Sequence, residues 1–323
     1  MSELAEYAQR LHQEESQFHN RVLKPLSCVG AAKELKGIRA VVCDVYGTLL
    51  NYWRPGFESR ESRDRVLVES FGELARRFGM NQTLEKMNPK EEPKSTLSGF
   101  YHGLIALSHD KAVRKGVQFP EVKIEEVWAL IIMMLKRNGY DPERFSPGCV
   151  SDFPRYLAFT YNFLCLGRQF YPGVIDALER LKRKNIAVGI LSNAQFYTPM
   201  DLTLLVRDQS EGRYDDFNEL FNVDLTFFSY EYGYSKPNQL LFRKLFDALY
   251  QFQILPSQTV LVGNDLSIDI QPAAAAGMKT AFFSGDDFVA FEHDLRGKVV
   301  PDLCFENWGE LVDKISFHGE SEE

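Results

Sequence analysis

Residues 38–50, with the sequence IRAVVCDVYGTLL, constrain the fold of this chain more than any other stretch. The apolar, β-branched run from Ile38 to Cys43 is typical of a buried strand in a parallel sheet. The run ends at Asp44, and Gly47 follows three residues later. Open α/β sheets bind ligands at the carboxyl ends of their strands, and a glycine allows close approach of the backbone to a ligand. We therefore expect Asp44 to be a nucleophile, with a turn-initiating aspartate as the alternative.

Helical periodicity replaces the strand pattern after Thr48 and continues to about residue 169. Apolar residues recur at intervals of three and four, and Gly79 and Gly139 supply natural helix ends. We predict helices near residues 66–78, 98–115, 123–138 and 152–168. No strand is predicted between residues 51 and 169. The sequence therefore predicts a helical domain over residues 51–169, inserted directly after the first strand.

The rest of the chain, from Tyr171 onward, alternates between strands and helices. We predict strands at 186–191, 223–229, 259–262, 279–283 and 299–305, and helices over 173–183, 237–249 and 306–315. Such alternation implies right-handed crossovers and a mostly parallel sheet. We therefore predict an α/β fold in which residues 38–50 and 170–318 form a doubly wound, mostly parallel, Rossmann-like sheet. The all-helical domain interrupts this fold as an insertion.

The N-terminal residues 1–37 form a helical extension in this scheme. Near-helical spacing between residues 2 and 19 is carried by Leu4, Tyr7, Ala8, Leu11 and Phe18. An amphipathic helix of this kind packs on the body of the protein or on a partner subunit. We expect a second short helical stretch between Pro25 and Gly37.

Composition argues against several classes of function. The 323 residues carry a formal net charge of -8, which argues against a nucleic-acid partner held through phosphate contacts. The N-terminus is polar and acidic, unlike a signal peptide, and no apolar run reaches the ~20 residues of a membrane span. The five cysteines lack CxxC spacing, which is typical of reduced thiols without a disulfide framework or zinc site. We therefore expect a cytoplasmic protein with no nucleic-acid or membrane partner, and the oligomeric state stays open.

Polar residues of catalytic type follow three of the later strands. They are Ser192 and Asn193 after the strand at 186–191, Lys236 after the strand at 223–229, and Asp265 and Asp269 after the strand at 259–262. In a parallel sheet these residues gather at the edge that carries Asp44. A carboxylate that attacks an anionic substrate needs cations and hydrogen-bond donors, which Lys236 and Ser192 can supply. Taken singly, each residue also fits a solvated lysine, a helix cap or a helix-dipole acid.

The acidic residues at these strand ends also predict a metal site. Two carboxylates as close as we expect Asp44 and Asp265 to be repel each other unless a cation lies between them. Mg²⁺ fits, because it binds oxygen ligands, keeps several waters and needs only one or two carboxylates. Asp269, one helical turn beyond Asp265, either joins the metal ligands or orients Lys236.

The four segments together resemble the four motifs of the haloacid dehalogenase superfamily of hydrolases. The matching segments are DVYGTLL at 44–50, LSN at 191–193, Lys236 in YSKPN, and VGNDLSIDIQPAAAAGMKT at 262–280. The resemblance implies that Asp44 forms a covalent aspartyl intermediate, that Ser192 and Lys236 steady it, and that the helical insertion is a cap. The substrate-binding positions that we assign are Tyr46, Gly47, Thr48 and Asn193. The metal positions are Asp44, the backbone carbonyl of Tyr46, Asp265 and Asp269.

Two positions depart from the usual pattern of the superfamily. Most of its phosphatases carry an aspartate two residues after the nucleophile as general acid and base, but this chain has Tyr46 there, as in the dehalogenase branch. That branch does not rely on Mg²⁺ and lacks a strongly acidic fourth motif, whereas this chain keeps Asp265 and Asp269 beside Asn264. The sequence therefore favours a Mg²⁺-dependent phosphatase with a small anionic substrate. A 2-haloacid dehalogenase and a non-catalytic binding or regulatory protein are the alternatives.

Overall fold

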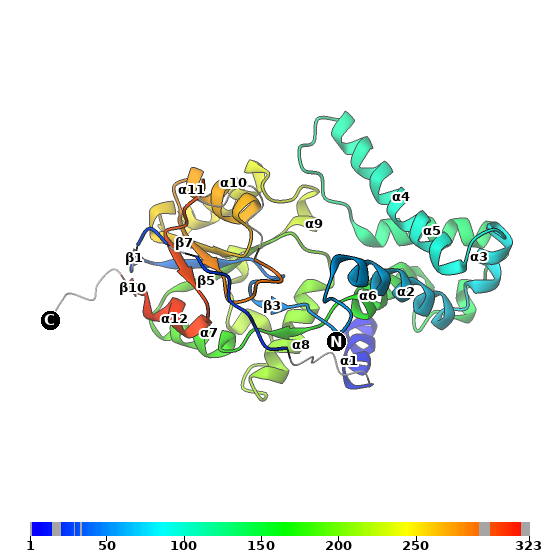
Figure 1. Ribbon diagram of the computed structural model, residues 1–323, viewed down its shortest axis with the longest axis horizontal. Coiled ribbons are helices and arrows are strands. Elements are labelled where there is room, and N and C mark those ends of the chain that lie inside the picture. The colour runs from blue at the N-terminus through cyan, green and yellow to red at the C-terminus, as the bar shows by residue number, and fades with distance from the viewer. Residues whose placement is uncertain (1, 15–20, 29, 33, 291–297, 318–323) are drawn as a thin grey trace. The chain divides into compact units, whose positions relative to one another are not determined.

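The computed structural model describes residues 2–14, 21–28, 30–32, 34–290 and 298–317 (Figure 1). The chain divides into two compact units. The helical unit consists of Met1–His19 and Trp53–Gly167, and the sheet unit consists of Asn20–Tyr52 and Arg168–Glu323. Each unit buries its own set of apolar side chains.

A six-stranded parallel sheet forms the centre of the sheet unit. Its strands, in spatial order, are β6 (Thr226–Phe228), β5 (Ala187–Ser192), β2 (Ala40–Cys43), β7 (Thr259–Gly263), β8 (Lys279–Phe283) and β9 (Leu303–Phe305). Every neighbouring pair runs parallel. β2 lies in the middle, where Val41 pairs with Val188 of β5 and Val260 of β7. The predicted mostly parallel sheet is therefore confirmed.

Helices cover both faces of this sheet. Successive residues of a strand point to opposite faces, so each strand contributes side chains to two cores. Val41 and Cys43 enter one core, whereas Ala40 and Val42 enter the other. The helices that contribute to the first core are α7 (Val174–Arg183), α8 (Thr198–Gln209) and α12 (Trp308–Asp313). Those of the second core are α10 (Gln239–Gln251) and α11 (Gln271–Ala275). Figure 1 shows α10 and α11 on one side of the sheet and α7 and α12 on the other, and a short helix, α9 (Ser229–Tyr232), follows β6.

Two short strand pairs lie outside the main sheet and correct the predicted boundaries. β1 (Leu35–Ile38) pairs in parallel with β10 (Ile315–Phe317), so Ile38 does not start the central strand as predicted. β3 (Leu50–Asn51) pairs antiparallel with β4 (Gln169–Phe170), although no strand was expected from 51 to 169. Both pairs are too short to show the alternating pattern from which strands are predicted.

The segment after residue 20 is the clearest difference from the prediction. A short helix was expected before Gly37, but residues 21–28, 30–32 and 34 contain none. Their backbone instead forms hydrogen bonds with residues far away in the sequence. Leu26 N donates to Ser284 O at 2.7 Å, and Ala32 N donates to Asp302 O at 2.7 Å. Cys28 is disulfide-bonded to Cys304, so the expectation of reduced thiols throughout was wrong. The two cysteines are 276 positions apart in the sequence, which hides this pairing from any spacing rule.

Six α-helices of the helical unit lie within its described residues. They are α1 (Glu3–Glu14), α2 (Arg60–Arg77), α3 (Asn81–Met87), α4 (Pro93–Arg114), α5 (Ile124–Arg137) and α6 (Phe153–Cys165). Ser59 caps α2 through its hydroxyl, which accepts the Ser62 backbone N–H. Phe71 of α2 stacks on Tyr161 of α6 with ring centroids 4.1 Å apart. The predicted helices of this region are present, and α3 is an addition.

The N-terminal helix α1 packs against α6 within the helical unit. The Tyr7 hydroxyl lies 2.8 Å from Thr160 Oγ1, and its ring meets Tyr156 edge-on with centroids 5.1 Å apart. Of the two predicted settings for this helix, the structure shows packing on the body of the protein. No helix among the described residues combines the length and the apolar character of a membrane span.

Candidate active site

The carboxyl edge of the parallel sheet collects four of the predicted site residues. They are Asp44 after β2, Ser192 at the end of β5, Lys236 between β6 and α10, and Asp269 after β7. The Nζ of Lys236 lies 2.7 Å from Asp44 Oδ1 and 2.6 Å from Asp269 Oδ1. Ser192 Oγ donates a 3.0 Å hydrogen bond to the same Asp44 oxygen. These four side chains form one buried, hydrogen-bonded cluster.

Lys236 is the cation at the centre of this cluster and is only 2% exposed. Burial by itself lowers the pKa of Lys236, but the carboxylates of Asp269 and Asp44 outweigh it and raise that pKa above the ordinary value. Asn193 fixes the backbone here, because its Oδ1 accepts the Lys236 N–H at 2.6 Å and its Nδ2 donates to the Lys236 carbonyl at 3.2 Å. Asn193, which was predicted to bind substrate, thus contacts the backbone of Lys236.

Asp269 is held between Lys236 and the backbone of the preceding turn. Its Oδ2 accepts the Asp265 N–H at 3.1 Å, so both carboxylate oxygens have partners. Burial raises the pKa of Asp269 to about 6, although Lys236 opposes the shift. The glycine at the end of β7 makes room for this carboxylate, because a Cβ on Gly263 would lie 2.4 Å from Asp269 Oδ2.

Asp265 caps the turn that follows β7. Its Oδ1 accepts hydrogen bonds from Ser267 N at 2.7 Å, Ser267 Oγ at 2.6 Å and Ile268 N at 3.1 Å. The π-helical turn Leu266–Ile270 begins at this cap and runs into α11. Within the described part of the chain, no group of three or more His, Cys, Asp or Glu side chains is arranged to hold a metal. A magnesium site here therefore needs a backbone carbonyl and water beside the carboxylates, which matches the ligands that Mg²⁺ takes in proteins.

Tyr46 occupies the position of the usual general acid, and its hydroxyl lies 2.9 Å from Thr198 Oγ1 at the start of α8. Burial, and next the charge of Asp201, raise the pKa of Tyr46 well above its ordinary value. Asp201 forms an ion pair with Arg168, whose Nε lies 3.2 Å from Asp201 Oδ1, and both side chains are buried. We did not predict this pair, and only the arginine within the apolar run LCLGRQF hinted at it.

The loop after Asp44 is connected to Asn264. Gly47 has a φ of 84°, and a Cβ there would lie 2.7 Å from Asn264 Nδ2, so both the backbone angle and the space favour glycine. Thr48, which is fully buried, donates a 3.0 Å hydrogen bond to Asn264 Oδ1. Asn264 Nδ2 in turn donates to the carbonyl of Val289. The sequence suggested only that Asn264 replaces an acid, and not that it joins three segments.

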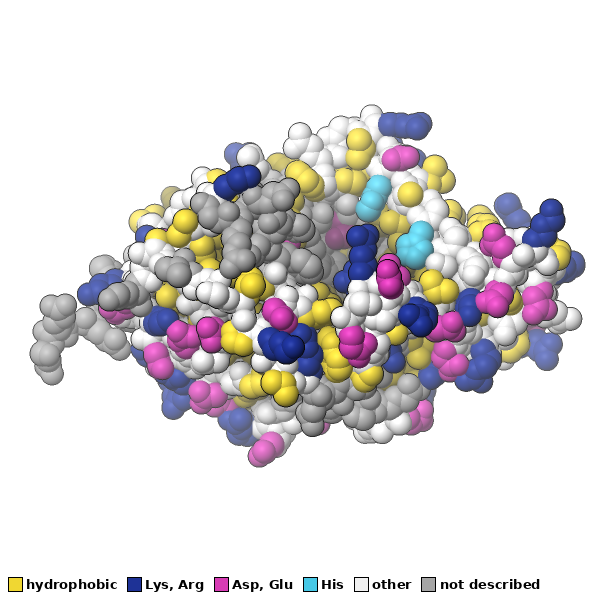
Figure 2. Space-filling view, viewed as in Figure 1, with side chains coloured by type: hydrophobic (Ala, Val, Ile, Leu, Met, Phe, Trp, Pro, Cys, Tyr) yellow, Lys and Arg dark blue, Asp and Glu magenta, His cyan; other side chains and the backbone are white. Residues whose placement is uncertain are grey.

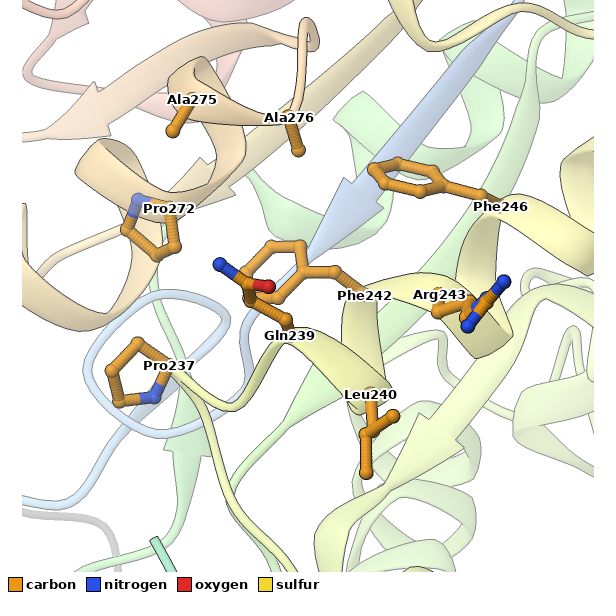
Figure 3. A pocket seen from close by; sticks show the side chains of 9 residues that line it. All are labelled: Pro237, Gln239, Leu240, Phe242, Arg243, Phe246, Pro272, Ala275 and Ala276. Atoms are coloured by element: carbon orange, nitrogen blue, oxygen red, sulfur yellow. The ribbon is translucent and has the colours of Figure 1, made fainter. Parts of the chain in front are cut away.

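A surface groove of about 470 Å³ lies beside α10 and α11 in the sheet unit. Its lining is mostly apolar and includes Pro237, Phe242, Phe246 and Pro272, as Figure 3 shows. None of the predicted site residues lines this groove, so it is distinct from the cluster around Asp44. Elsewhere, acidic and basic side chains intermix on the face seen in Figure 2, which fits the modest net charge.

Comparison with known families explains why these strand ends carry the same residues as the four motifs. A model of the haloacid dehalogenase-like hydrolases matches residues 38–277. The chain belongs to this family. This membership agrees with the family that the four motifs led us to expect.

Individual relatives of this haloacid dehalogenase-like hydrolase include a phosphatase and a dehalogenase. A glyceraldehyde 3-phosphate phosphatase of Pyrococcus furiosus is 28% identical over 144 residues, which are 45% of this chain. The chain spans only 53% of that relative's length. A 2-haloacid dehalogenase of Pseudomonas syringae pv. Tomato DC3000 superposes with a TM-score of 0.50 at 18% identity, over 85% of this chain and 97% of that one. A phosphatase of the same family from Thermococcus onnurineus gives a TM-score of 0.46 at 17% identity, over 85% and 97% of the two chains.

Proposed function

We propose that this protein is a Mg²⁺-dependent phosphatase that uses Asp44 as a nucleophile on a small anionic substrate. The observation that carries the proposal is the charge balance at the edge of the sheet. Asp44, Asp265 and Asp269 bring three carboxylates to this edge, and the charges of Asp44 and Asp265 both contribute to raising the pKa of Asp269. Lys236 supplies a single positive charge among them. A dianionic phosphoryl group adds to this negative charge, so a divalent cation is needed to offset it.

The hydrogen bonds of Asp44 indicate which oxygen attacks. Ser192 and Lys236 both donate to Oδ1, and no hydrogen bond from the described residues ends on Oδ2. Oδ2 attacks phosphorus, an Oδ2–P bond forms, and the bond from phosphorus to the leaving oxygen breaks. Water then attacks the aspartyl phosphate, which releases inorganic phosphate and restores the carboxylate. Throughout, Lys236 and Ser192 hold the carboxylate in a fixed orientation.

The residues proposed to hold Mg²⁺ are Asp44, Asp265 and the carbonyl of Tyr46, with water. When bound, the ion neutralises charge on the phosphoryl oxygens. For Asp269, the two contacts of its carboxylate support the second of its predicted roles, the orientation of Lys236. The helical insertion is proposed to be the cap that selects the substrate. A phosphatase relative supports this choice of reaction.

Tyr46 favours a second candidate, a 2-haloacid dehalogenase. Its hydroxyl is hydrogen-bonded to Thr198 and its raised pKa makes it a weak acid, so it is poorly suited to protonate a leaving alkoxide. A halide leaves without a proton, so this arrangement is no handicap to dehalogenation. For a phosphatase, the same arrangement favours substrates with good leaving groups.

One pair of assays tests the proposal against both alternatives. We expect the full chain to hydrolyse p-nitrophenyl phosphate with Mg²⁺, to lose activity in chelator and to regain it when Mg²⁺ is restored. Asp265→Asn should lose Mg²⁺-dependent turnover, whereas Asp224→Asn, at an exposed aspartate before β6, should not. Chelator-indifferent halide release from 2-chloropropionate would instead identify a dehalogenase. If the chain turns over neither substrate, the result would support the other alternative, a non-catalytic binding or regulatory protein.

A substitution at Tyr46 sharpens the same test. Tyr46→Asp restores a general acid, a group that typically contributes 10²–10⁴-fold to the rate. We expect phosphatase activity to rise, most of all on an alkyl phosphate with a poor leaving group. Tyr46→Phe, which removes the hydroxyl but adds no acid, is the matched control and should bring no such gain. Equal changes in the two variants would contradict a general-acid role for this position.

A further inference from the structure

A strap of N-terminal chain, residues 21–28, bonds to the loop that follows β8, residues 284–290. Arg21 Nη1 lies 2.9 Å from Asp286 Oδ1, and Arg21 Nη2 lies 2.9 Å from Asp287 Oδ1. The guanidinium also stands over the Phe288 ring, 5.3 Å from its centroid. The strap and the loop are thus joined by a fork of two ion pairs and a cation–π contact.

Backbone hydrogen bonds extend this contact along the strap. Asp287 N donates to Lys24 O at 2.7 Å, and Leu26 N donates to Ser284 O at 2.7 Å. Cys28, further along the strap, is covalently linked to Cys304 of β9. The strap is therefore attached at several points to the part of the sheet unit that carries the loop.

Asp286 is the buried anchor of this arrangement and has no solvent exposure. Besides Arg21, its carboxylate accepts the Tyr171 hydroxyl at 3.1 Å and the Phe288 N–H at 3.1 Å. Burial raises the pKa of Asp286, and these donors together with Arg21 oppose the shift. A buried carboxylate that loses its cation is costly, so Arg21 and Asp286 depend on each other.

The loop of residues 284–290 also bonds to Asn264. Asn264 in turn supports the turn that follows Asp44, residues 44–50, which we call the nucleophile loop. The Val289 carbonyl accepts the Asn264 side-chain N–H, and Asn264 Oδ1 accepts the Thr48 hydroxyl. Val289 N bonds back to the Asp286 carbonyl at 3.2 Å, so the anchor sets where the Val289 carbonyl lies. A continuous set of contacts therefore leads from Arg21 through Asp286 and Asn264 to the turn that follows Asp44.

We propose that Arg21 and Asp286 are positioning residues for catalysis, which act through Asn264 on the loop of residues 44–50. This inference rests on the proposed hydrolytic function of Asp44 for its kinetic part only. The strap does not reach the reacting atoms itself. Its effect is to fix the Val289 carbonyl, and thereby the amide of Asn264, in the one position that also receives Thr48.

The test compares Arg21→Gln with Arg180→Gln in the full chain. Arg180 forms an ion pair with Asp313 in the same unit and takes no part in the contacts to Asn264, so it is a matched control. We expect Arg21→Gln to lower kcat by about 10- to 100-fold with little change in KM, because a small misplacement of a reacting group is enough. Arg21→Lys keeps a charge near Asp286 and should recover part of the loss.

A double-mutant cycle tests the route through Asn264. If Arg21 acts through Asn264, the double variant Arg21→Gln, Asn264→Ala should turn over no more slowly than Asn264→Ala alone. Additive losses in kcat would overturn the proposed route. A lower unfolding temperature with an unchanged kcat per folded molecule would overturn the proposal as a whole.

Hydrogen exchange gives a readout that does not need activity. The amides of Gly47, Leu49 and Leu50 bond within the nucleophile loop, to Leu50 O, Val45 O and Val45 O, at 2.8, 3.0 and 2.8 Å. We expect Arg21→Gln to speed their exchange and Arg180→Gln to leave it unchanged. Unchanged exchange in both variants would overturn the positioning role. If the wild type turns over neither assay substrate, faster exchange in Arg21→Gln still supports the contact while the proposed function fails.

Discussion

The two units of the molecule bury different kinds of side chain. In the sheet unit, polar and charged residues are buried at strand ends, as with Asp44, Lys236 and Asp269. In the helical unit, the buried centre is aromatic, and Phe71 contacts Tyr161 and Trp128 there. Ion pairs of this unit, such as Arg76 with Glu73, lie at its surface.

This difference suggests that the side chains buried in the sheet unit serve the reaction, whereas those buried in the helical unit serve packing. Parallel strands bring distant residues to one edge, where buried charges must pair with each other. Helices in contact exclude water through large apolar side chains and leave their charges solvated. We therefore expect substitutions in the sheet unit to change rate more than stability, and those in the helical unit to do the reverse.

The largest expected effect follows from Asp44→Asn. Loss of the nucleophile should reduce turnover by about 10⁴-fold or more, whereas the amide keeps the size and shape of the carboxylate. Activity is measured on the substrate that the wild type hydrolyses, and folding by chemical denaturation. A variant that unfolds like the wild type but keeps a few per cent of its activity would remove Asp44 from this role.

The reverse pattern is expected for Phe71→Ala in the helical unit. Phe71 is fully buried, so the cavity left behind should lower the free energy of unfolding by about 3–5 kcal/mol. The value of kcat per folded molecule should stay close to that of the wild type. Leu107→Ala, at a residue of α4 that is 64% exposed, is the control and should change neither quantity. A large loss of kcat in Phe71→Ala would break the separation between the units.

A smaller effect, with a pH signature, is expected for Asp269→Asn. Removal of one of the two carboxylates around Lys236 should lower kcat by about 10²-fold. Because burial raises the pKa of Asp269 to about 6, this group gains a proton as the pH falls through 6 and weakens its hold on Lys236. Wild-type activity should therefore fall below about pH 6, and the pH–rate profile of the variant should lack this limb. The same acidic limb in both proteins would assign it to another group.

The smallest effect is expected for Glu73→Gln on the surface of α2. Hydrogen bonds from Arg76, with lesser contributions from Arg77, lower the pKa of Glu73 to about 2. The resulting stabilisation is fully present when the pH is above 4.5, the ordinary pKa of a glutamate, and it is lost as the pH falls toward 2. Because the pair is partly exposed and screened, we expect only about 0.3–0.5 kcal/mol at pH 7. Urea denaturation at pH 7 and pH 3.5 should show a smaller difference between variant and wild type at the lower pH.

The sheet was predictable from the sequence because its strands are apolar runs with polar residues at their ends. Val41 to Cys43 and Thr259 to Val262 are examples, and both lie where expected. The strap was not predictable, because its hydrogen bonds run to residues more than 250 positions away, as between Leu26 and Ser284. Local periodicity carries no information about such contacts.

The site was predictable in its members but not in their bonding. Asp44, Ser192 and Lys236 were expected together, and the structure brings them together, although their catalytic roles stay predictions. The sequence did not reveal that Asn193 holds the backbone of Lys236, or that Asn264 links Thr48 to Val289. Each of these is a hydrogen bond between segments that no motif relates. Residue type alone gave no signal for them.

The pairing of β3 with β4 has a consequence for how such a protein can change over time. The insertion leaves the sheet unit after Tyr52 and returns at Arg168, next to strands in which Leu50 lies opposite Phe170. Suppose that residues 53–167 are replaced by another helical insertion, together with the N-terminal helix α1 that packs on α6. The two points where the insertion joins the sheet unit then stay in place. If the insertion selects the substrate, as proposed, a chimaera that carries another insertion would exchange substrate preference while the two ends of the insertion still meet at neighbouring strands.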